Sequence, residues 1–391
     1  MRSYLKSHPW ITFKATDINE LGAKTWMLLG EARSKCEHLA GAPLRPDVAE
    51  RLYDVYLAKG AQATTAIEGN TLTEEQVAGI LAGTFKAPPS RAYQEREVRN
   101  VLDALQGIAD RIRKGDPPAI TKDLICDFNR QLLDGTGHES DAVPGRIRSH
   151  EVLVAAYRGA PAQDCEFLLD RLAEWLESDT FSSDDLEIEF ALVVARAVYS
   201  HLYMAWLHPF GDGNGRTARL LEFLILARSG MAPLPAAHLL SNHYNLTRDQ
   251  YYRELAKASR SHQTVDFVTY AIQGFVDGLR GQIEEVRALQ LEVAWINYVH
   301  DTMNLYPSSP TRDRQRALVL AMPSGTYVPK HELPVLTPKL AALYATKGPR
   351  TLSRDLNRLS DAGLVHGRRK GWMANHFIIK AFLPPVAEGS R

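Results

Sequence analysis

The sequence has few cysteines, no long apolar run and no net charge. Its three cysteines, Cys36, Cys126 and Cys165, lie far apart without a C-x-x-C pair, which argues against a thiolate zinc site and fits a reducing compartment. No apolar run approaches the roughly 20 residues of a membrane-spanning helix, and the N-terminus lacks the apolar stretch of a signal peptide. We therefore expect a soluble, cytoplasmic protein without a membrane partner.

The absence of net charge hides an asymmetry along the chain. The 46 Lys and Arg residues equal the 46 Asp and Glu residues, yet residues 311–391 carry 14 basic and 5 acidic residues, leaving 32 and 41 for the rest. A basic domain of this kind either contacts nucleic acid or has an ordinary solvated surface. The length of 391 residues predicts two or three domains at roughly 100–200 residues each.

Most of residues 17–305 has the pattern of α-helix. Residues 186–207 are apolar on nearly every face, as expected of a helix buried in the centre of a bundle. Residues 47–59 predict an amphipathic helix that stops at Gly60. Residues 144–162 contain a short run of β-favouring residues followed by Gly and Pro, which predicts a small hairpin.

A different pattern begins after residue 305. Residues 306–312 predict a linker, and a basic turn between two strands ends the segment. Helices are expected at 313–322, 337–345 and 350–362. The helices at 337–345 and 350–362, followed by a strand pair, have the order typical of a winged helix-turn-helix. The predicted fold class is therefore mostly α, a helical bundle with a small β-hairpin and a C-terminal winged helix-turn-helix domain.

The stretch from His208 to Arg219, HPFGDGNGRTAR, carries the most chemical information. Because the residue before a proline disfavours the helical conformation, the central helix should end at His208. A glycine-rich loop, 211–215, follows, and a new helix is expected to begin near Arg216. A glycine-rich loop that opens onto a helix start is typical of an anion site.

Four side chains in this stretch suit phosphoryl or nucleotidyl transfer. Arg216 and Arg219 can bind phosphate oxygens, and Asp212 is the one acid available to hold Mg²⁺. His208 has the ordinary pKa of a group that accepts a proton from a hydroxyl. Each residue also has a structural interpretation, such as Asp212 as a turn former, and no Lys-Ser/Thr pair follows as in a Walker A loop.

The combination resembles the motif HxFx(D/E)GNGRxxR of the Fic family at every defining position. This resemblance implies a mostly helical, Fic-type bundle that transfers AMP from ATP to a Ser, Thr or Tyr hydroxyl of a target protein. It implies that His208 deprotonates the hydroxyl and that Asp212 holds Mg²⁺ at the α- and β-phosphates. The expected phosphate-binding residues are Gly213, Asn214, Gly215, Arg216 and Arg219.

Two further segments resemble family features. Residues 152–155, which include Val154 and Ala155, resemble the hairpin flap to which a target segment adds as a β-strand. Residues 251–255 resemble the family's YYxxL segment, in which the first tyrosine, here Tyr251, lines the adenine pocket. The alternative for this tyrosine pair is a core-facing helix stripe, and the sequence leaves both interpretations open.

Residues 64–69, TTAIEG, resemble the family's inhibitory motif (S/T)xxxE(G/N), with Thr64, Glu68 and Gly69 in the fixed places. The resemblance implies an inhibitory helix that precedes the catalytic core. Glu68 paired with Arg219 would occupy the site of the ATP γ-phosphate and misplace the α-phosphate. Alternatively, Glu68 is a solvated acid at a helix end.

The basic C-terminal segment could read DNA. The helix expected at 350–362 places three arginines four residues apart on one face, and a basic turn at 368–370 suits phosphate contact. The arginines are Arg350, Arg354 and Arg358, and the leucines expected to face the core are Leu352, Leu356 and Leu359. Such folds also serve as dimerisation or protein-docking modules.

The expected organisation has four parts. Residues 1–110 form an N-terminal helical region with the inhibitory helix, 111–280 the Fic catalytic core, 281–310 a connecting helix and linker, and 311–391 the winged-helix domain. The resemblance implies ATP and Mg²⁺, a homodimer, automodification, and also removal of AMP at the same site. The competing class is a DNA-binding regulator whose Fic module senses nucleotide.

Overall fold

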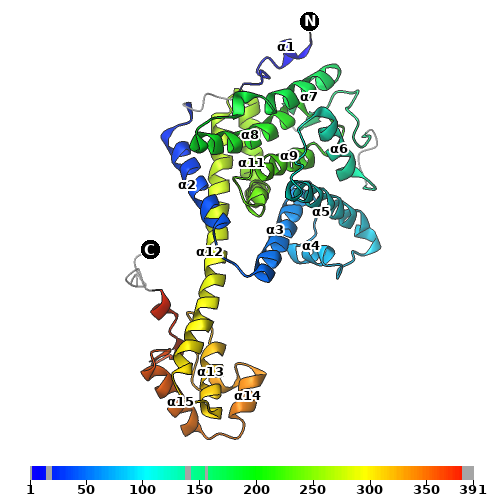
Figure 1. The fold of residues 1–391 in the computed structure, drawn as a ribbon. Coiled ribbons are helices and arrows are strands. Elements are labelled where there is room, and N and C mark those ends of the chain that lie inside the picture. Colours follow the sequence, from blue (N-terminus) through cyan, green and yellow to red (C-terminus); the bar gives the residue numbers. More distant parts are fainter. Residues whose placement is uncertain (1, 15–19, 137–141, 155–156, 381–391) are drawn as a thin grey trace. The chain divides into compact units, whose positions relative to one another are not determined.

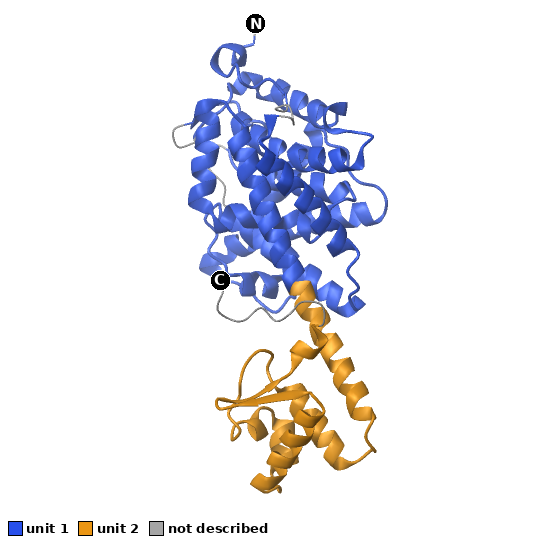
Figure 2. Cartoon of the chain, turned by 90° about the vertical axis from the view of Figure 1, so that its left-hand side faces the viewer, with its two compact units in different colours: residues 1–284 blue, residues 285–391 orange. Residues whose placement is uncertain are grey.

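The computed structural model describes residues 2–14, 20–136, 142–154 and 157–380. The chain divides into two compact units, residues 1–284 and 285–391 (Figure 2). The helices and strands (Figure 1) are α1 (Tyr4–Ser7), α2 (Ala23–Ala40), α3 (Pro46–Ala66), α4 (Glu74–Leu81), η2 (Pro89–Arg91), α5 (Ala92–Arg113), α6 (Lys122–Leu133), β1 (Leu153–Val154), β2 (Tyr157–Arg158), α7 (Ala162–Leu176), η3 (Asp179–Phe181), α8 (Leu186–Leu207), α9 (Asn214–Arg228), η4 (Ala236–His238), α10 (Leu239–Leu246), α11 (Arg248–Ser261), α12 (Val265–Asn304), α13 (Pro310–Ala321), η5 (Leu333–Val335), α14 (Pro338–Tyr344), α15 (Pro349–Asp361), β3 (Val365–Arg368), β4 (Gly371–Ala374) and η6 (His376–Ile379).

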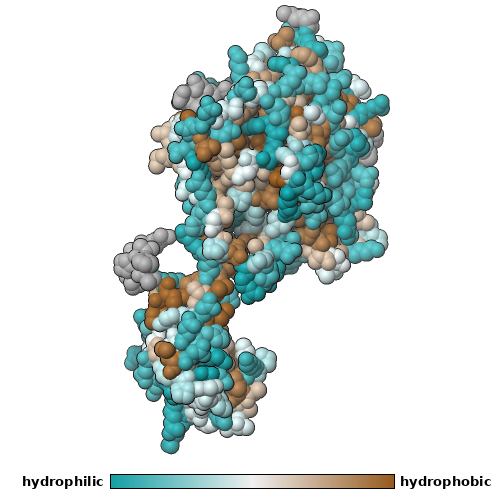
Figure 3. Space-filling model, in the orientation of Figure 1, coloured by the Kyte–Doolittle hydropathy of each residue, from teal (hydrophilic) through white to brown (hydrophobic). Residues whose placement is uncertain are grey.

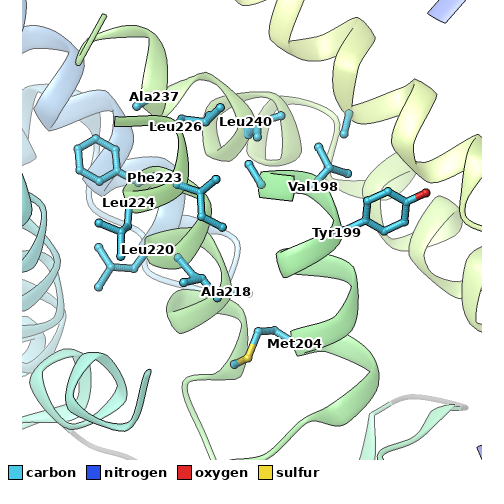
Figure 4. Close-up of a cluster of buried hydrophobic side chains, with 14 of the residues drawn as sticks. Val198, Tyr199, Met204, Ala218, Leu220, Phe223, Leu224, Leu226, Ala237 and Leu240 are labelled. Carbon is cyan, nitrogen blue, oxygen red and sulfur yellow. The ribbon is translucent and has the colours of Figure 1, made fainter. Parts of the chain in front are cut away.

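Helix α8 lies in the centre of the first unit, as the sequence predicts. Asp185 caps its start by accepting a hydrogen bond from the amide of Glu187 at 2.7 Å. The helix is long and apolar enough to cross a membrane by composition, yet 83% of its most apolar 18-residue window is buried inside the protein. Its apolar side chains pack against those of α9 (Figure 4), so the two helices that flank the 208–213 loop share one core.

The surface of the first unit contrasts with this core. The face visible in Figure 3 is mostly hydrophilic, with hydrophobic residues scattered between polar ones. The apolar residues gather instead in one continuous core cluster that draws on helices from α2 to α12. Burial of that area stabilises the bundle and fixes the ends of α8 and α9 between which the glycine-rich loop runs.

The predicted end of a helix at Gly60 is wrong. Helix α3 continues through this glycine to Ala66. A Cβ atom at position 60 would clash with the ring of His238, so the glycine permits close packing between α3 and η4. Helix α3 therefore includes the first three residues of the TTAIEG motif and ends two residues before Glu68.

The predicted hairpin is confirmed as a two-stranded antiparallel pair. Leu153 of β1 lies opposite Arg158 of β2, and Val154 lies opposite Tyr157. The amide of Gly159 donates to the carbonyl oxygen of Val152 at 3.2 Å and extends the pairing by one residue.

The second unit contains α13, α14 and α15 followed by the strand pair β3–β4. Helix α13 begins at Pro310, inside the expected linker, because Ser309 caps it by accepting from the amide of Arg312 at 3.2 Å and proline suits the first helical position. Leu352, Leu356 and Leu359 of α15 are buried, as predicted from their spacing.

Candidate active site

His208 stands at the junction between α8 and the glycine-rich loop. The helix ends at Leu207, and His208 adopts the left-handed conformation, with φ 47° and ψ 57°. Its amide still donates to the carbonyl oxygen of Met204 at 2.9 Å. The predicted end of the helix before Pro209 is therefore confirmed.

The loop after His208 is closed by a side chain. Asn214, the first residue of α9, accepts from the amide of Phe210 at 2.9 Å and donates to its carbonyl oxygen at 2.8 Å. Its amide group is thus engaged inside the loop. Asn129 of α6 donates to the carbonyl oxygen of Asp212 at 2.9 Å, and Gly213 follows with φ 77°. The protein's own side chains thus fix the shape of the loop.

Asp212 and Arg216 form an ion pair at 3.0 Å. Arg216 also donates to Glu97 of α5 at 3.3 Å, and Glu97 in turn accepts from Asn70 at 3.0 Å. Burial raises the pKa of Glu97. The structure therefore places the expected metal ligand and one expected phosphate-binding arginine against each other, and adds a second carboxylate that carried no signal in the sequence.

Arg219 is completely buried and is paired with Glu68. One of its terminal nitrogens, Nη2, lies 2.5 Å from Glu68 Oε1 and 2.9 Å from the carbonyl oxygen of Thr64. Burial alone would raise the pKa of Glu68, but the charge and hydrogen bonds of Arg219 outweigh it and hold that pKa below its usual value. Within the described chain, Nε and Nη1 of Arg219 have no hydrogen-bond partner, so part of its donor capacity is free for an anion.

The carboxylate of Glu68 also lies against the start of α9. A Cβ atom at Gly215 would clash with Glu68 Oε1 and lie 3.1 Å from Arg219 Nη1. The first turn of a helix attracts anions through its free amides and its dipole. Glu68 thus occupies the place where the sequence predicts a phosphate, and Gly69, with φ 100°, turns the chain away after it.

Tyr251 of α11 belongs to a buried hydrogen-bond network. Its hydroxyl lies 2.9 Å from His201 Nε2, and His201 Nδ1 lies 2.9 Å from Glu222. The hydroxyl of Tyr244 donates to the other oxygen of Glu222 at 2.8 Å. Burial raises the pKa of Tyr251. The inward hydroxyl favours the core-facing interpretation, whereas Tyr252 is 45% exposed and donates to the carbonyl oxygen of Ile67 at 3.3 Å.

The environment of His208 favours its neutral form. Burial, reinforced by the cation of Arg148, lowers the pKa of His208 to about 4. An imidazole that is neutral at pH 7 can accept a proton. Of the expected flap residues, Val154 forms part of β1 and Ala155 lies outside the described residues. Leu153, next to them, is 69% exposed.

Sequence reasoning missed several residues of this site. They act through contacts between distant segments, which no local pattern reveals, and they are Glu97, Arg148, His201 and Glu222. Two of them, His201 of α8 and Glu222 of α9, are buried ionisable groups.

Known proteins that are similar in sequence to this chain include protein adenylyltransferases. Residues 119–226 match the family model of the Fic/DOC family. Protein adenylyltransferase fic-1 of Caenorhabditis briggsae is 29% identical over 248 residues, 62% of this chain and 44% of that protein. Protein adenylyltransferase Fic of Nematostella vectensis is 33% identical over 172 residues, 44% of this chain and 38% of that protein. The chain therefore spans less than half the length of these relatives.

Solved structures share the fold. A Fic family protein from Desulfovibrio desulfuricans G20 has a TM-score of 0.56 at 21% identity. The match covers 97% of this chain and 99% of that protein's chain. Residues 134–508 of Fic-1 from Caenorhabditis elegans give a TM-score of 0.53 at 26% identity, with 68% of this chain and 72% of that chain covered.

Proposed function

We propose, because residues 119–226 match the family model of the Fic/DOC family, that this chain is a protein adenylyltransferase. It would transfer AMP from ATP to the hydroxyl of a Ser, Thr or Tyr side chain on a target protein. The observation that carries this proposal is the placement of a neutral His208 beside a preformed loop that opens onto the start of α9, with Arg219 one turn further.

His208 would act as the general base. Its imidazole accepts the proton of the target hydroxyl while the oxygen attacks the α-phosphorus of ATP. The new oxygen–phosphorus bond forms as the bond to the bridging oxygen breaks, and pyrophosphate leaves. A group with a pKa of about 4 is almost wholly neutral at pH 7, so no prior deprotonation step is needed.

The triphosphate would lie at the start of α9. The backbone of Gly213 and Gly215 permits close approach, and the free donors of Arg219 suit an outer phosphate. Magnesium, when bound with ATP, would neutralise charge on the phosphate oxygens. The described residues contain no group of three or more His, Cys, Asp or Glu side chains placed to hold a metal. A single carboxylate, Asp212, fits a Mg²⁺ ion held mainly by substrate phosphates.

Glu68 would inhibit this reaction in the resting enzyme. Its carboxylate occupies donor capacity of Arg219 and lies against Gly215, so a γ-phosphate cannot bind there at the same time. Release of Glu68 would open the phosphate site. The hairpin β1–β2, whose first strand includes Val154, would bind the target as an added strand.

The test is labelling from ATP that carries ³²P in its α-phosphate. We expect Glu68→Gly to increase labelling of the protein itself and of lysate proteins, and we expect Glu68→Gly with His208→Ala to show none. Glu74→Gly is a matched control because Glu74 is an exposed acid of α4 with no contact to Arg219. The proposal fails if the Glu68→Gly protein labels no more than wild type and binds ATP normally.

A second function is favoured by the charge of the second unit. Arg350, Arg354 and Arg358 are exposed on α15, and Arg369 and Lys370 lie in the exposed turn between β3 and β4. We propose that this unit is a winged helix that binds DNA through phosphate contacts. Electrophoretic mobility of the whole protein at low and high salt tests it, since phosphate binding must weaken with salt. We also propose that the protein is cytoplasmic and forms a homodimer. Light scattering tests the oligomeric state.

A further inference from the structure

Arg148 precedes the hairpin and is buried, with 5% of its surface exposed. Its guanidinium donates to three backbone carbonyl oxygens: Nε to His208 at 2.7 Å, Nη1 to His150 at 2.6 Å, and Nη2 to Ala160. Nη2 also lies 3.4 Å from the carbonyl oxygen of Leu207. One side chain thus joins the end of α8 to the segments that enter and leave the β1–β2 hairpin.

These contacts give partners both to carbonyl groups at the end of α8 and to the buried guanidinium. The last carbonyl groups of a helix have no partner within the helix, and the negative end of the helix dipole favours a cation. Among the residues that the structure describes, the hydrogen-bond partners of Arg148 are backbone carbonyl oxygens, and no carboxylate is paired with it. A buried cation without partners is costly. Arg148 is therefore satisfied only while the three backbone segments keep this arrangement.

We infer that Arg148 is the positioning residue that fixes His208 relative to the target-binding hairpin. This inference rests on the proposed function. His208 has a left-handed backbone, which is unfavourable for a residue other than glycine. The bond from Arg148 Nε holds its carbonyl group in that conformation. Because the same guanidinium holds His150 and Ala160, a strand added to the hairpin is placed at a fixed distance from the imidazole.

The packing around the guanidinium leaves little freedom. A Cβ atom at Gly159 would lie 3.1 Å from Arg148 Nη2 and 3.1 Å from His208 Cβ. His8 Nε2 lies 2.9 Å from the carbonyl oxygen of Arg158 and so covers the outer edge of β2. An added strand would therefore pair with the outer edge of β1. A displacement of about 1 Å between a base and its substrate can reduce the rate about 100-fold.

The charge of Arg148 has a second effect on His208. Burial is the main cause of the lowered pKa of His208, and Arg148 acts in the same direction. The carboxylates of Glu68 and Asp212 and the carbonyl oxygen of Ala205 act in the opposite direction. Loss of the cation should therefore raise the pKa of His208, whereas a lysine at this position should keep much of the electrostatic effect and lose the multiple hydrogen bonds.

The experiment compares Arg148→Met and Arg148→Lys in the Glu68→Gly protein. Arg146→Met is the matched control, because Arg146 is exposed two residues earlier. We expect Arg148→Met to reduce AMP transfer about 100-fold at unchanged affinity for ATP. Amide hydrogen exchange at Gly159, Ala160 and His208 should increase, and the pKa of His208, followed by NMR, should rise. Arg148→Lys should reduce transfer with little change in that pKa.

Transfer by Arg148→Met equal to that of the Arg146→Met control, or unchanged exchange at the three amides, would overturn the inference. If Arg148→Met does not fold, the Arg148→Lys protein supplies the same comparison. If the Glu68→Gly protein transfers no AMP at all, the proposed function fails, while hydrogen exchange and the His208 titration still decide whether Arg148 joins the helix end to the hairpin.

Discussion

The carboxylate of Glu68 lies where the side chain of any residue larger than glycine at position 215 would have to be. The two residues come from segments almost 150 positions apart, one after α3 and the other in the first turn of α9. The start of α9, where free amides and the helix dipole attract negative charge, therefore holds a carboxylate from the chain itself. Glycine at this position is required both by that carboxylate and, in the proposed reaction, by phosphate.

Gly215→Ala should destabilise the protein through this contact. The added methyl group must displace the carboxylate of Glu68, and we expect a loss of about 1–3 kcal/mol in the free energy of unfolding. In the Glu68→Gly background the same substitution should cost clearly less, because only the 3.1 Å approach to Arg219 Nη1 remains. Urea unfolding of the four proteins measures the coupling. Equal costs in both backgrounds would show that the two residues do not interact.

Glu68→Gln should change the pH dependence of stability. The pKa of Glu68 in the folded protein lies below its usual value because Arg219 outweighs the effect of burial. Its ionised form therefore stabilises the fold above the unfolded-state pKa of about 4.3, and this contribution is lost as pH falls through the lower folded-state pKa. The difference in unfolding free energy between wild type and Glu68→Gln should be largest near pH 7.

Urea unfolding at several pH values between 7 and 3.5 tests this expectation. The difference between the two proteins should shrink below about pH 4.3. Glu74→Gln, a change at an exposed acid of α4, provides the control and should leave the pH dependence unchanged. A difference that stays constant across the range would mean that Glu68 is not ionised beside Arg219.

Local signals in the sequence predicted the elements that depend on neighbouring residues. Pro209 predicted the end of α8, and the short β-favouring run in residues 144–162, followed by Gly and Pro, predicted the hairpin. The spacing of the leucines in α15 predicted its buried face. The motif from His208 to Arg219 located the loop and the start of α9 to within two residues.

Contacts between distant segments could not be predicted in this way. Gly60 has the local pattern of a helix end, but its role is set by the ring of His238. Arg148 appears in the sequence as one of several basic residues, and its burial depends on carbonyl groups that meet only in the folded chain. The engagement of Asn214 inside the loop likewise follows from the backbone geometry at Phe210.

AMP transfer by the Glu68→Gly protein should persist at acidic pH. Because the pKa of His208 is about 4, the imidazole stays neutral between pH 7 and pH 5, and the rate at saturating ATP and Mg²⁺ should change little. Removal of Glu68 also removes a carboxylate that raises this pKa. Rates measured from pH 7 to pH 4, with ATP affinity determined at each pH, test this. A half-maximal rate near pH 6.5 at constant affinity would contradict a buried neutral base.

Gly60→Ala and Gly107→Ala should have opposite effects on stability although both residues lie inside helices. At position 60 the new methyl group clashes with the ring of His238, and we expect a loss of about 1–3 kcal/mol. At position 107, in α5, no atom lies within 4 Å of the added Cβ, so alanine should stabilise the helix by about 0.5–1 kcal/mol. Urea unfolding of the two variants measures both changes.

The same pair of variants should differ in ATP binding. Since α3 ends two residues before Glu68, the Gly60→Ala protein should bind ATP more readily than wild type, whereas Gly107→Ala should not. Equal ATP affinity in all three proteins would show that α3 does not set the position of Glu68.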